Sequence, residues 1–338
     1  MWATITVKQK MRPTSERNPG PHHTGISGPH PMESPAYIDR NTQPISSESP
    51  DPTEVQTLTD SLGAAQADQL AAQRTALALP FLVAAIRRDP KFPSPALAPV
   101  YSSLLTLLAL GGTRGVSTYD SSQVLIEGLL TIGLNVQDYR ALIDDVGELA
   151  GEGFGIEMIF WTLEVIEAFM RHATPDADAR EIFMHQLLAR IVAIKMRLST
   201  LQLAAVRQLV IEFGWSSEEL QTVQHQTAQD SFALCLLDKK VAIYSLLETA
   251  SRQAKCVLEA AAPGISVECN ADFGGTSRLR ALAQNSDIFI IVWAAAKHAA
   301  TDFIRAHRGT RTLLYAQGKG FSSLLRAIED HFKLRGKS

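Results

Sequence analysis

Two short loops near the C-terminal end of the chain carry residue types that could bind an anion. The sequence QGKGFSS, Gln317 to Ser323, places two glycines, a lysine and two hydroxyls before a predicted helix. The sequence AAKHAAT, which ends at Thr301, places Lys297 and His298 before another. Free N–H groups and the dipole at a helix N-terminus favour negative charge. Both loops are therefore candidate anion sites, although helix capping alone would explain either one.

Polar residues also follow the two other predicted strands of this region. Because the carboxyl ends of parallel strands form one edge, where open α/β sheets bind ligands, we expect all these residues to converge there. His298 is the candidate acid/base, with Lys297 and Lys319 as phosphate clamps. The expected ligand-binding residues are Ser245, Asn270, Asp272, Thr276, Lys297, His298, Thr301, Gln317, Gly318, Lys319, Gly320 and Ser322.

The elements that must position these residues alternate strictly from residue 238 onward. Strands are predicted at Val241–Leu247, Ile265–Asn270, Asp287–Ala294 and Thr312–Gln317. Helices are predicted at Glu248–Ala262, after the capping residue Thr276, at Lys297–Arg308 and at Ser322–Phe332. Alternation with short connections is typical of a parallel sheet with right-handed crossovers. The expected strand order is 2-1-3-4, which makes residues 238–338 a small Rossmann-like, flavodoxin-like α/β domain.

Several familiar nucleotide and phosphate motifs are absent from this domain. The segment after the first strand, SLLETASRQA, holds no glycine, which excludes a Gly-x-Gly-x-x-Gly fingerprint there. In GKGFSS the lysine is not followed by Ser or Thr, so the loop is not a Walker A motif. The third strand ends in Trp293, Ala294 and Ala295, where a phosphorelay receiver needs an aspartate. The sequence assigns no reaction and no cofactor.

The rest of the chain divides into a tail and a helical region. Residues 1–53 are rich in Pro, Ser, Gly and His, which predicts disorder because little apolar surface is available for burial. Residues 54–230 have helical periodicity throughout and predict an all-helical bundle. The helices are expected at Leu70–Arg88, Ala96–Leu110, Ser121–Ile132, Val136–Ala150, Ile156–His172, from Asp176 to Leu198, at Leu201–Phe213 and at Ser217–Thr227.

Metal binding is not expected in either region. Nothing fixes the geometry of His22, His23 and His30 in the tail. Di-iron bundles need Glu-x-x-His pairs on facing helices, and the helical region contains none. The glutamates Glu157, Glu164 and Glu167 are interpreted as a solvated acidic face, away from the apolar face of their helix.

Composition and charge indicate the cellular compartment of the protein and the part of the chain that would attract an anion. The chain has no apolar run of about 18 residues and no secretory signal, which predicts a cytoplasmic protein without membrane contact. Its three cysteines lack metal-ligand spacing. The net charge is −3, yet residues 238–338 hold 15 Lys and Arg against 9 Asp and Glu. This basic C-terminal domain is the part that would attract an anion, although a solvated basic surface explains the charge equally well.

The combination NADFGGT, LRALAQNSDIFIIVWAAAKHAATDFI and YAQGKGFSSLLRAIE resembles an uncharacterised Rossmann-like domain of bacterial proteins, associated with mobile-element and anti-phage defence gene neighbourhoods. The resemblance covers Lys239 to Phe332 and leaves the helical region unmatched. It implies a context of defence or DNA-related regulation and supplies no mechanism.

Three functions fit these observations. The first is a ligand-sensing or adaptor protein whose α/β domain binds a nucleotide or other phosphorylated anion and whose helical region binds a protein partner. The second is an enzyme acting on a nucleotide or a nucleic-acid end, with His298 as acid/base. The third is a helical scaffold with a purely structural α/β domain. Binding of nucleic acid is compatible with the first two.

Overall fold

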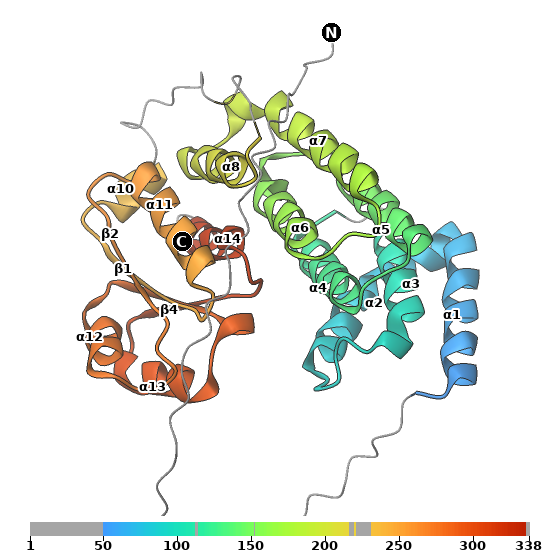
Figure 1. Ribbon diagram of the computed structural model, residues 1–338, viewed down its shortest axis with the longest axis horizontal. Helices are drawn as coiled ribbons and strands as arrows, with labels where there is room; N and C mark the ends of the chain where they lie inside the picture. Colours follow the sequence, from blue (N-terminus) through green and yellow to red (C-terminus); the bar gives the residue numbers. More distant parts are fainter. Residues whose placement is uncertain (1–49, 112–113, 152, 216–219, 221–230, 336–338) are drawn as a thin grey trace, which may run out of the picture.

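The computed structural model describes residues 50–111, 114–151, 153–215, 220 and 231–335. It consists of a helical part followed by an α/β part, as the sequence predicts (Figure 1). The predicted tail up to residue 49 and most of the predicted helix Ser217–Thr227 lie outside these ranges.

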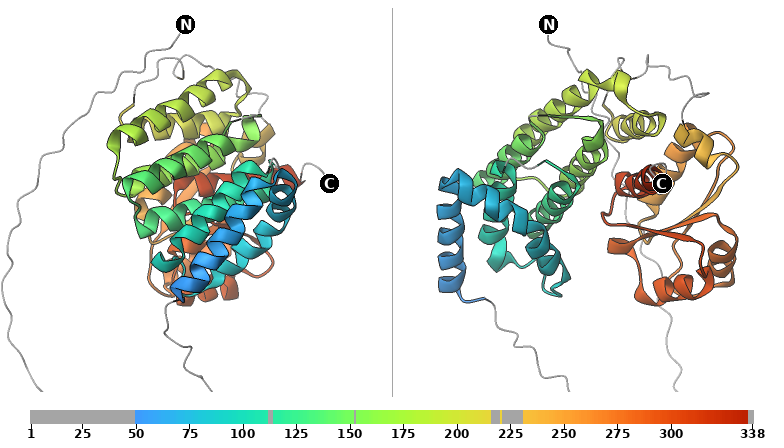
Figure 2. Two further views of the ribbon diagram at one scale, coloured as in Figure 1. Left: turned by 90° about the vertical axis from the view of Figure 1, so that its right-hand side faces the viewer. Right: turned by 180° about the vertical axis from the view of Figure 1, so that it is seen from behind.

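The helical part begins at Pro52, one residue before the predicted end of the tail, and its helices pack side by side in layers (Figures 1 and 2). Its α-helices are α1 (Pro52–Ala67), α2 (Gln69–Arg88), α3 (Ala98–Leu110), α4 (Val116–Ile132), α5 (Val136–Leu149), α6 (Ile159–Arg171), α7 (Ala177–Ala193) and α8 (Thr200–Glu212). Short 3₁₀ turns occupy Pro95–Leu97, Ile156–Met158 and Lys195–Arg197.

Local sequence explains where these helices begin and end. Asp51, Asn135 and Asp176 each accept a backbone N–H from the first turn of the helix that follows, which satisfies one of the free donors there. Ser199 and Gln202 form a reciprocal capping box at the start of α8. The helix predicted to run to Leu198 instead ends at Ala193, and the basic residues Lys195 and Arg197 lie in a 3₁₀ turn.

By length and composition α2 is the described helix that could cross a membrane, although it packs here against α1, α3 and α4. Part of the α2 surface is apolar and exposed to solvent. Leu70, Leu77 and Phe81 are exposed along one side of it.

The α/β part has four parallel strands in the order β2-β1-β3-β4, which confirms the predicted fold class and strand order. A short helix absent from the sequence prediction, α10, precedes the first strand. The elements are α10 (Ser231–Leu236), β1 (Lys240–Tyr244), α11 (Glu248–Ala261), β2 (Ser266–Asn270), α12 (Ser277–Asn285), β3 (Ile288–Val292), a 3₁₀ turn (Trp293–Ala295), α13 (His298–Arg308), β4 (Thr312–Ala316) and α14 (Phe321–Arg335).

Alternate residues of the strands face two different helical layers, as the twofold repeat of a strand requires. Val241 and Ile243 of β1 join a core that includes α11 and α14, whereas Ala242 and Tyr244 join a smaller core with α12 and α13. The sheet is thus buried on both faces.

The two parts of the chain share one hydrophobic core. α11 packs against α8, and α14 packs against α6, so these two helices lie between the sheet and the helical part (Figures 1 and 2). The layer formed by α12 and α13 lies on the far side of the sheet. The helical part therefore covers one face of the α/β part and reaches the carboxyl end of the strands.

Candidate functional site

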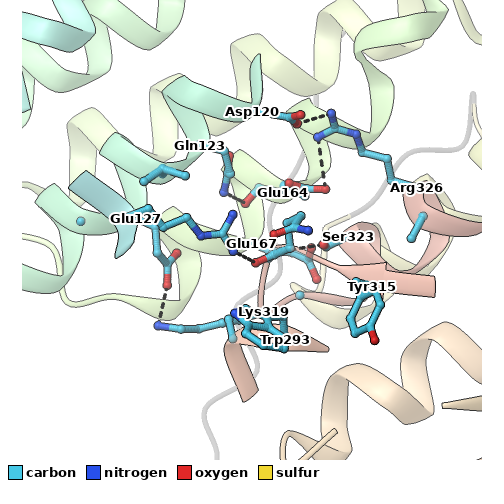
Figure 3. Close-up of a pocket in the computed structure, with 18 of the residues that line it drawn as sticks. Asp120, Gln123, Glu127, Glu164, Glu167, Trp293, Tyr315, Lys319, Ser323 and Arg326 are labelled. Carbon is cyan, nitrogen blue, oxygen red and sulfur yellow. Dashed lines mark hydrogen bonds and ion pairs between the residues drawn. The ribbon is translucent and has the colours of Figure 1, made fainter. Parts of the chain in front are cut away.

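A cavity of about 660 Å³ lies between the carboxyl ends of β3 and β4 and the helices α2, α4 and α6 (Figure 3). This volume is within the usual range for small-molecule sites, about 300–1,000 Å³. The α/β part contributes the loops before α13 and α14 and the first turns of α14. The helical part contributes the opposite wall, which is rich in charged side chains.

At the floor of the cavity Glu167 of α6 caps the N-terminus of α14. Its carboxylate accepts hydrogen bonds from the backbone N–H groups of Phe321 (2.9 Å) and Ser322 (3.3 Å). Gly320 lets the carboxylate approach this closely, because a Cβ at Gly320 would overlap the Glu167 carboxylate. Burial raises the pKa of Glu167 to about 7, against the opposing effect of these hydrogen bonds and of Arg171. The helix terminus that the sequence offers to an anion thus holds a carboxylate of the chain itself.

One turn earlier on α6, Glu164 lies beside Arg326 of α14 (Figure 3). The guanidinium of Arg326 is 3.8 Å from Glu164 and also pairs with Asp120 of α4. Only 5% of the surface of Glu164 is exposed, and this burial raises its pKa to about 8 even though Arg326 opposes the shift. Through these two contacts Arg326 connects α14 of the α/β part with α4 and α6 of the helical part.

Lys319 extends from the loop before α14 to Glu127 of α4, with 3.0 Å between the ammonium and a carboxylate oxygen (Figure 3). Arg171 and His172 lie within 3.6 Å and 3.4 Å of the same carboxylate. Burial acts to raise the pKa of Glu127, but Arg171 and Lys319 outweigh it and hold the pKa below its ordinary value. The charge of Lys319 is therefore largely balanced within the protein.

Arg87 at the end of α2 differs from the other cations of the cavity. Its guanidinium donates to the carbonyl oxygen of Gln317 (3.1 Å), and no described carboxylate forms an ion pair with it. Burial lowers its pKa from the ordinary value, and the negative charge of Asp120 only partly opposes this effect of desolvation. An anion in the cavity would restore the lost stabilisation.

Aromatic rings line the cavity at the carboxyl end of the strands. Trp293 after β3 and Tyr315 of β4 have ring centroids 6.1 Å apart, and His298 lies 6.2 Å from Trp293. Trp293 is 41% exposed, so part of its ring is open to a ligand. The cavity thus combines a half-buried cation at one side with aromatic surface at the other.

Comparison with known proteins identifies the family of this chain. A family model described as DpdD-like matches residues 33–327, which is most of the chain. The chain belongs to the DpdD-like family. The match corrects the extent of the resemblance inferred from sequence, because it includes the helical part of this DpdD-like protein as well as the α/β part. No curated protein and no solved structure matches the chain.

Half of the ligand-binding residues proposed for this DpdD-like chain line the cavity. They are His298, Thr301, Gln317, Gly318, Lys319 and Gly320, all contributed by the loops and helix starts after β3 and β4. His298 and Lys319 therefore share one cavity. No hydrogen bond or ion pair in the described part of the chain joins His298 to a carboxylate, so the structure supplies no partner for an acid/base role.

The remaining candidates lie elsewhere. Lys297 is exposed outside the cavity, and Ser322 is buried in the first turn of α14. After β2, Asp272 accepts hydrogen bonds from the side chains of Asn270 (2.9 Å) and Thr276 (2.5 Å), while Thr276 caps α12. The hydroxyl of Ser245 accepts from the N–H of Leu247 (3.0 Å). These groups stabilise loops and helix ends and do not converge with His298.

The charged wall contributed by the helical part was missed by the sequence prediction. Glu164 and Glu167 were interpreted as solvated, and the structure shows this to be wrong: they are only 5% and 8% exposed, whereas Glu157 is exposed. A partial signal was present, since apolar residues cover most of the circumference of α6 and leave only a narrow polar sector around Glu164, Glu167 and Arg171. Glutamates in so narrow a sector can be buried as well. Within the ranges that the structure describes, no His, Cys, Asp and Glu group could hold a metal ion.

Proposed function

We propose that this chain is a ligand-binding component of a phage-defence system that modifies DNA, and that its cavity takes a nucleotide or a similar phosphorylated molecule with a planar ring. The context is supported by membership of the DpdD-like family, which is linked to such a system. The ligand class is supported by the side chains that line the cavity.

The observation that carries the proposal is the state of Arg87. Lys319 and Arg326 already pair with Glu127 and Asp120, so they attract an added anion only weakly. Arg87 donates to a carbonyl oxygen and forms no ion pair with a described carboxylate, although Asp120 acts on it at longer range, and its planar guanidinium suits a phosphate group. Trp293, which is 41% exposed, offers aromatic surface to a base beside Tyr315. A molecule with a phosphate at one end and a planar ring at the other matches both features.

We propose that the cavity binds its ligand without converting it, because the described residues place no nucleophile beside a base. The enzymatic alternative would need His298 to act without a carboxylate partner. If a nucleotide is found to bind, loss of product formation in His298→Ala would favour the alternative. Absence of turnover in the wild-type chain supports the binding role.

Nucleotide binding can be tested with the full chain by isothermal titration calorimetry and thermal shift. A ligand that binds only the folded state raises the melting temperature, by an amount that grows with the logarithm of its concentration above the dissociation constant. We expect stabilisation by nucleotides and a smaller effect of the corresponding nucleosides. Arg87→Ala should weaken nucleotide affinity about tenfold or more, since a charge-assisted hydrogen bond contributes about 1.5–3 kcal/mol.

Arg88→Ala is the matched control, because Arg88 is the neighbouring, exposed arginine of the same helix and does not line the cavity. The proposal fails if no nucleotide stabilises the chain at millimolar concentration. It also fails if the substitutions of Arg87 and Arg88 weaken binding equally.

A further inference from the structure

Exposed apolar side chains follow three neighbouring strands of the sheet. Leu247 after β1, Phe273 after β2 and Trp293 after β3 are 39%, 74% and 41% exposed. Single exposed apolar residues are ordinary on protein surfaces. Here, however, the three lie at the carboxyl ends of strands that are adjacent in the order β2-β1-β3, so they form a row along one rim of the α/β part.

The layer of α12 and α13 beside this rim carries cations next to aromatic rings. The guanidinium of Arg280 lies 5.7 Å from the ring centroid of Phe303, and that of Arg305 lies 5.6 Å from Trp293. Arg305 also lies 5.4 Å from the centroid of Tyr315. Cations are held at such positions by the negative face of an aromatic ring. Arginine and aromatic side chains thus alternate across this surface.

The charge of this surface is only partly balanced within the protein. Residues 271–311 contain six Lys and Arg against three Asp and Glu, but Arg308 is buried and Arg305 pairs with Asp302 (3.6 Å). Among the described residues no ion pair involves Lys297 or Arg280. Asp272, next to Phe273, accepts hydrogen bonds from Asn270 and Thr276, which lower its pKa and keep it negatively charged. The cavity differs, because most of its cations are paired with carboxylates. Lys297 and Arg280 are therefore open to contact with the phosphates of a ligand at this surface.

We propose that this rim and the adjoining α12–α13 layer bind single-stranded nucleic acid. Bases would stack on Phe273, and phosphates would contact Lys297 and Arg280. Proteins that bind single strands combine such stacking surfaces with cations that follow the backbone. A double helix hides the faces of its bases and could use only the cations. The α12–α13 layer lies on the far side of the sheet from the helical part, whereas the rim borders the cavity at Trp293 (Figure 1).

The test uses the full chain and a fluorescently labelled oligonucleotide of about 15 nucleotides, the upper range of the length that one small domain contacts. Fluorescence anisotropy gives the dissociation constant at several salt concentrations. Binding should weaken steeply with salt, and Lys297→Glu combined with Arg280→Glu should reduce the salt dependence by about one counterion per lost contact. Phe273→Ala should weaken binding about tenfold, because stacking on one aromatic side chain contributes about 1–3 kcal/mol per base.

Two matched controls make the result specific. Phe81→Ala removes an exposed phenylalanine of α2, and Arg252→Glu reverses an exposed charge of α11 in the opposite layer of the sheet. Both should leave affinity unchanged, and circular dichroism should show that every variant is folded. Phe273 does not line the cavity, so its effect is independent of nucleotide binding there.

The proposal is overturned if the oligonucleotide does not bind at low salt, if a duplex of the same length binds more tightly, or if the control variants weaken binding as much as Phe273→Ala. Binding of a protein partner at this rim with no affinity for the oligonucleotide would also overturn it.

Discussion

Glu167 shows how one side chain changes what a motif can do. The loop QGKGFSS has the composition of an anion site, and its helix terminus does accept negative charge. The charge comes from α6, far away in the sequence, because Gly320 leaves space for the carboxylate beside the N–H groups of Phe321 and Ser322. The N–H groups that could bind an anion therefore hold α14 of the α/β part to α6 of the helical part.

A first prediction concerns Gly320. In Gly320→Ala the new methyl group would displace the Glu167 carboxylate from the α14 N-terminus. We expect a loss of about 1–2 kcal/mol in the free energy of unfolding, similar to the loss of a helix cap. Gly274→Ala is the control, since nothing lies within 4 Å of its Cβ position. Urea unfolding measures both, and equal losses in the two variants would contradict the capping role of Glu167.

A second prediction concerns pH. The pKa of Glu164 in the folded protein is raised to about 8 by burial, so the folded chain binds this proton more tightly than the unfolded chain does. Its contribution to stability is complete below the ordinary range of a glutamate and is lost as pH rises towards about 8. Glu164→Gln should therefore flatten the decline in the free energy of unfolding between about pH 5 and pH 8. A profile as steep as that of the wild type would show that Glu164 does not carry this dependence.

At the scale of elements, Arg308 fastens the α12–α13 layer to the sheet. Its side chain is only 2% exposed and donates to the carbonyl oxygens of Ala283, Ser286, Asp287 and Thr312. These acceptors belong to the end of α12, the approach to β3 and the start of β4. Burial lowers the pKa of Arg308 to about 10, which still leaves it charged at neutral pH.

A third prediction follows from these contacts. Arg308→Ala would leave several buried carbonyl oxygens without donors, each costing about 1–3 kcal/mol, so the free energy of unfolding should fall by about 3 kcal/mol or more. Arg311→Ala removes a nearby exposed arginine and should change it by less than about 0.5 kcal/mol. Chemical denaturation compares the two. A small effect of Arg308→Ala would mean that water replaces the guanidinium at these acceptors.

The strands and helices of the α/β part could be predicted from the sequence, whereas the contacts between the two parts of the chain could not. The strands are short apolar runs between polar connectors, as at DIFIIVWA, and their alternation with helices indicates a parallel sheet. The candidate residues after β3 and β4 could be placed near one another for this reason. Burial of Glu164 depends on Arg326, 162 positions later in the sequence, and no local pattern encodes that contact. The charged wall was missed because it arises from packing of the helical part on the sheet edge.

At the scale of the whole molecule, the helical and α/β parts are bound by a continuous core. Apolar residues of α11 and α14, among them Val257, Leu258, Leu324 and Ile328, belong to the same buried cluster as those of α6 and α8. The contacts of Glu167, Arg326 and Lys319 cross the same boundary. Disruption of either part should therefore weaken the other.

A fourth prediction tests this dependence. The full chain should unfold in one transition by near- and far-ultraviolet circular dichroism, since two probes coincide when unfolding is cooperative. A fragment of residues 238–338 would expose the faces of α11 and α14 that α8 and α6 cover. We expect it to bind the dye ANS and to lack a sharp transition. Cooperative unfolding of the fragment near the melting temperature of the full chain would show that the parts are independent.

The carboxylate of Glu167 at the start of α14 has a consequence for selectivity. A tethered group acts as a competitor at an effective concentration of millimolar or above, whatever the composition of the surrounding solution. Inorganic phosphate can bind at the N-terminus of α14 only by displacing the Glu167 carboxylate, which is part of the chain. Only a molecule that gains additional contacts elsewhere in the cavity, with Arg87 and with the rings of Trp293 and Tyr315, can bind well without that helix end.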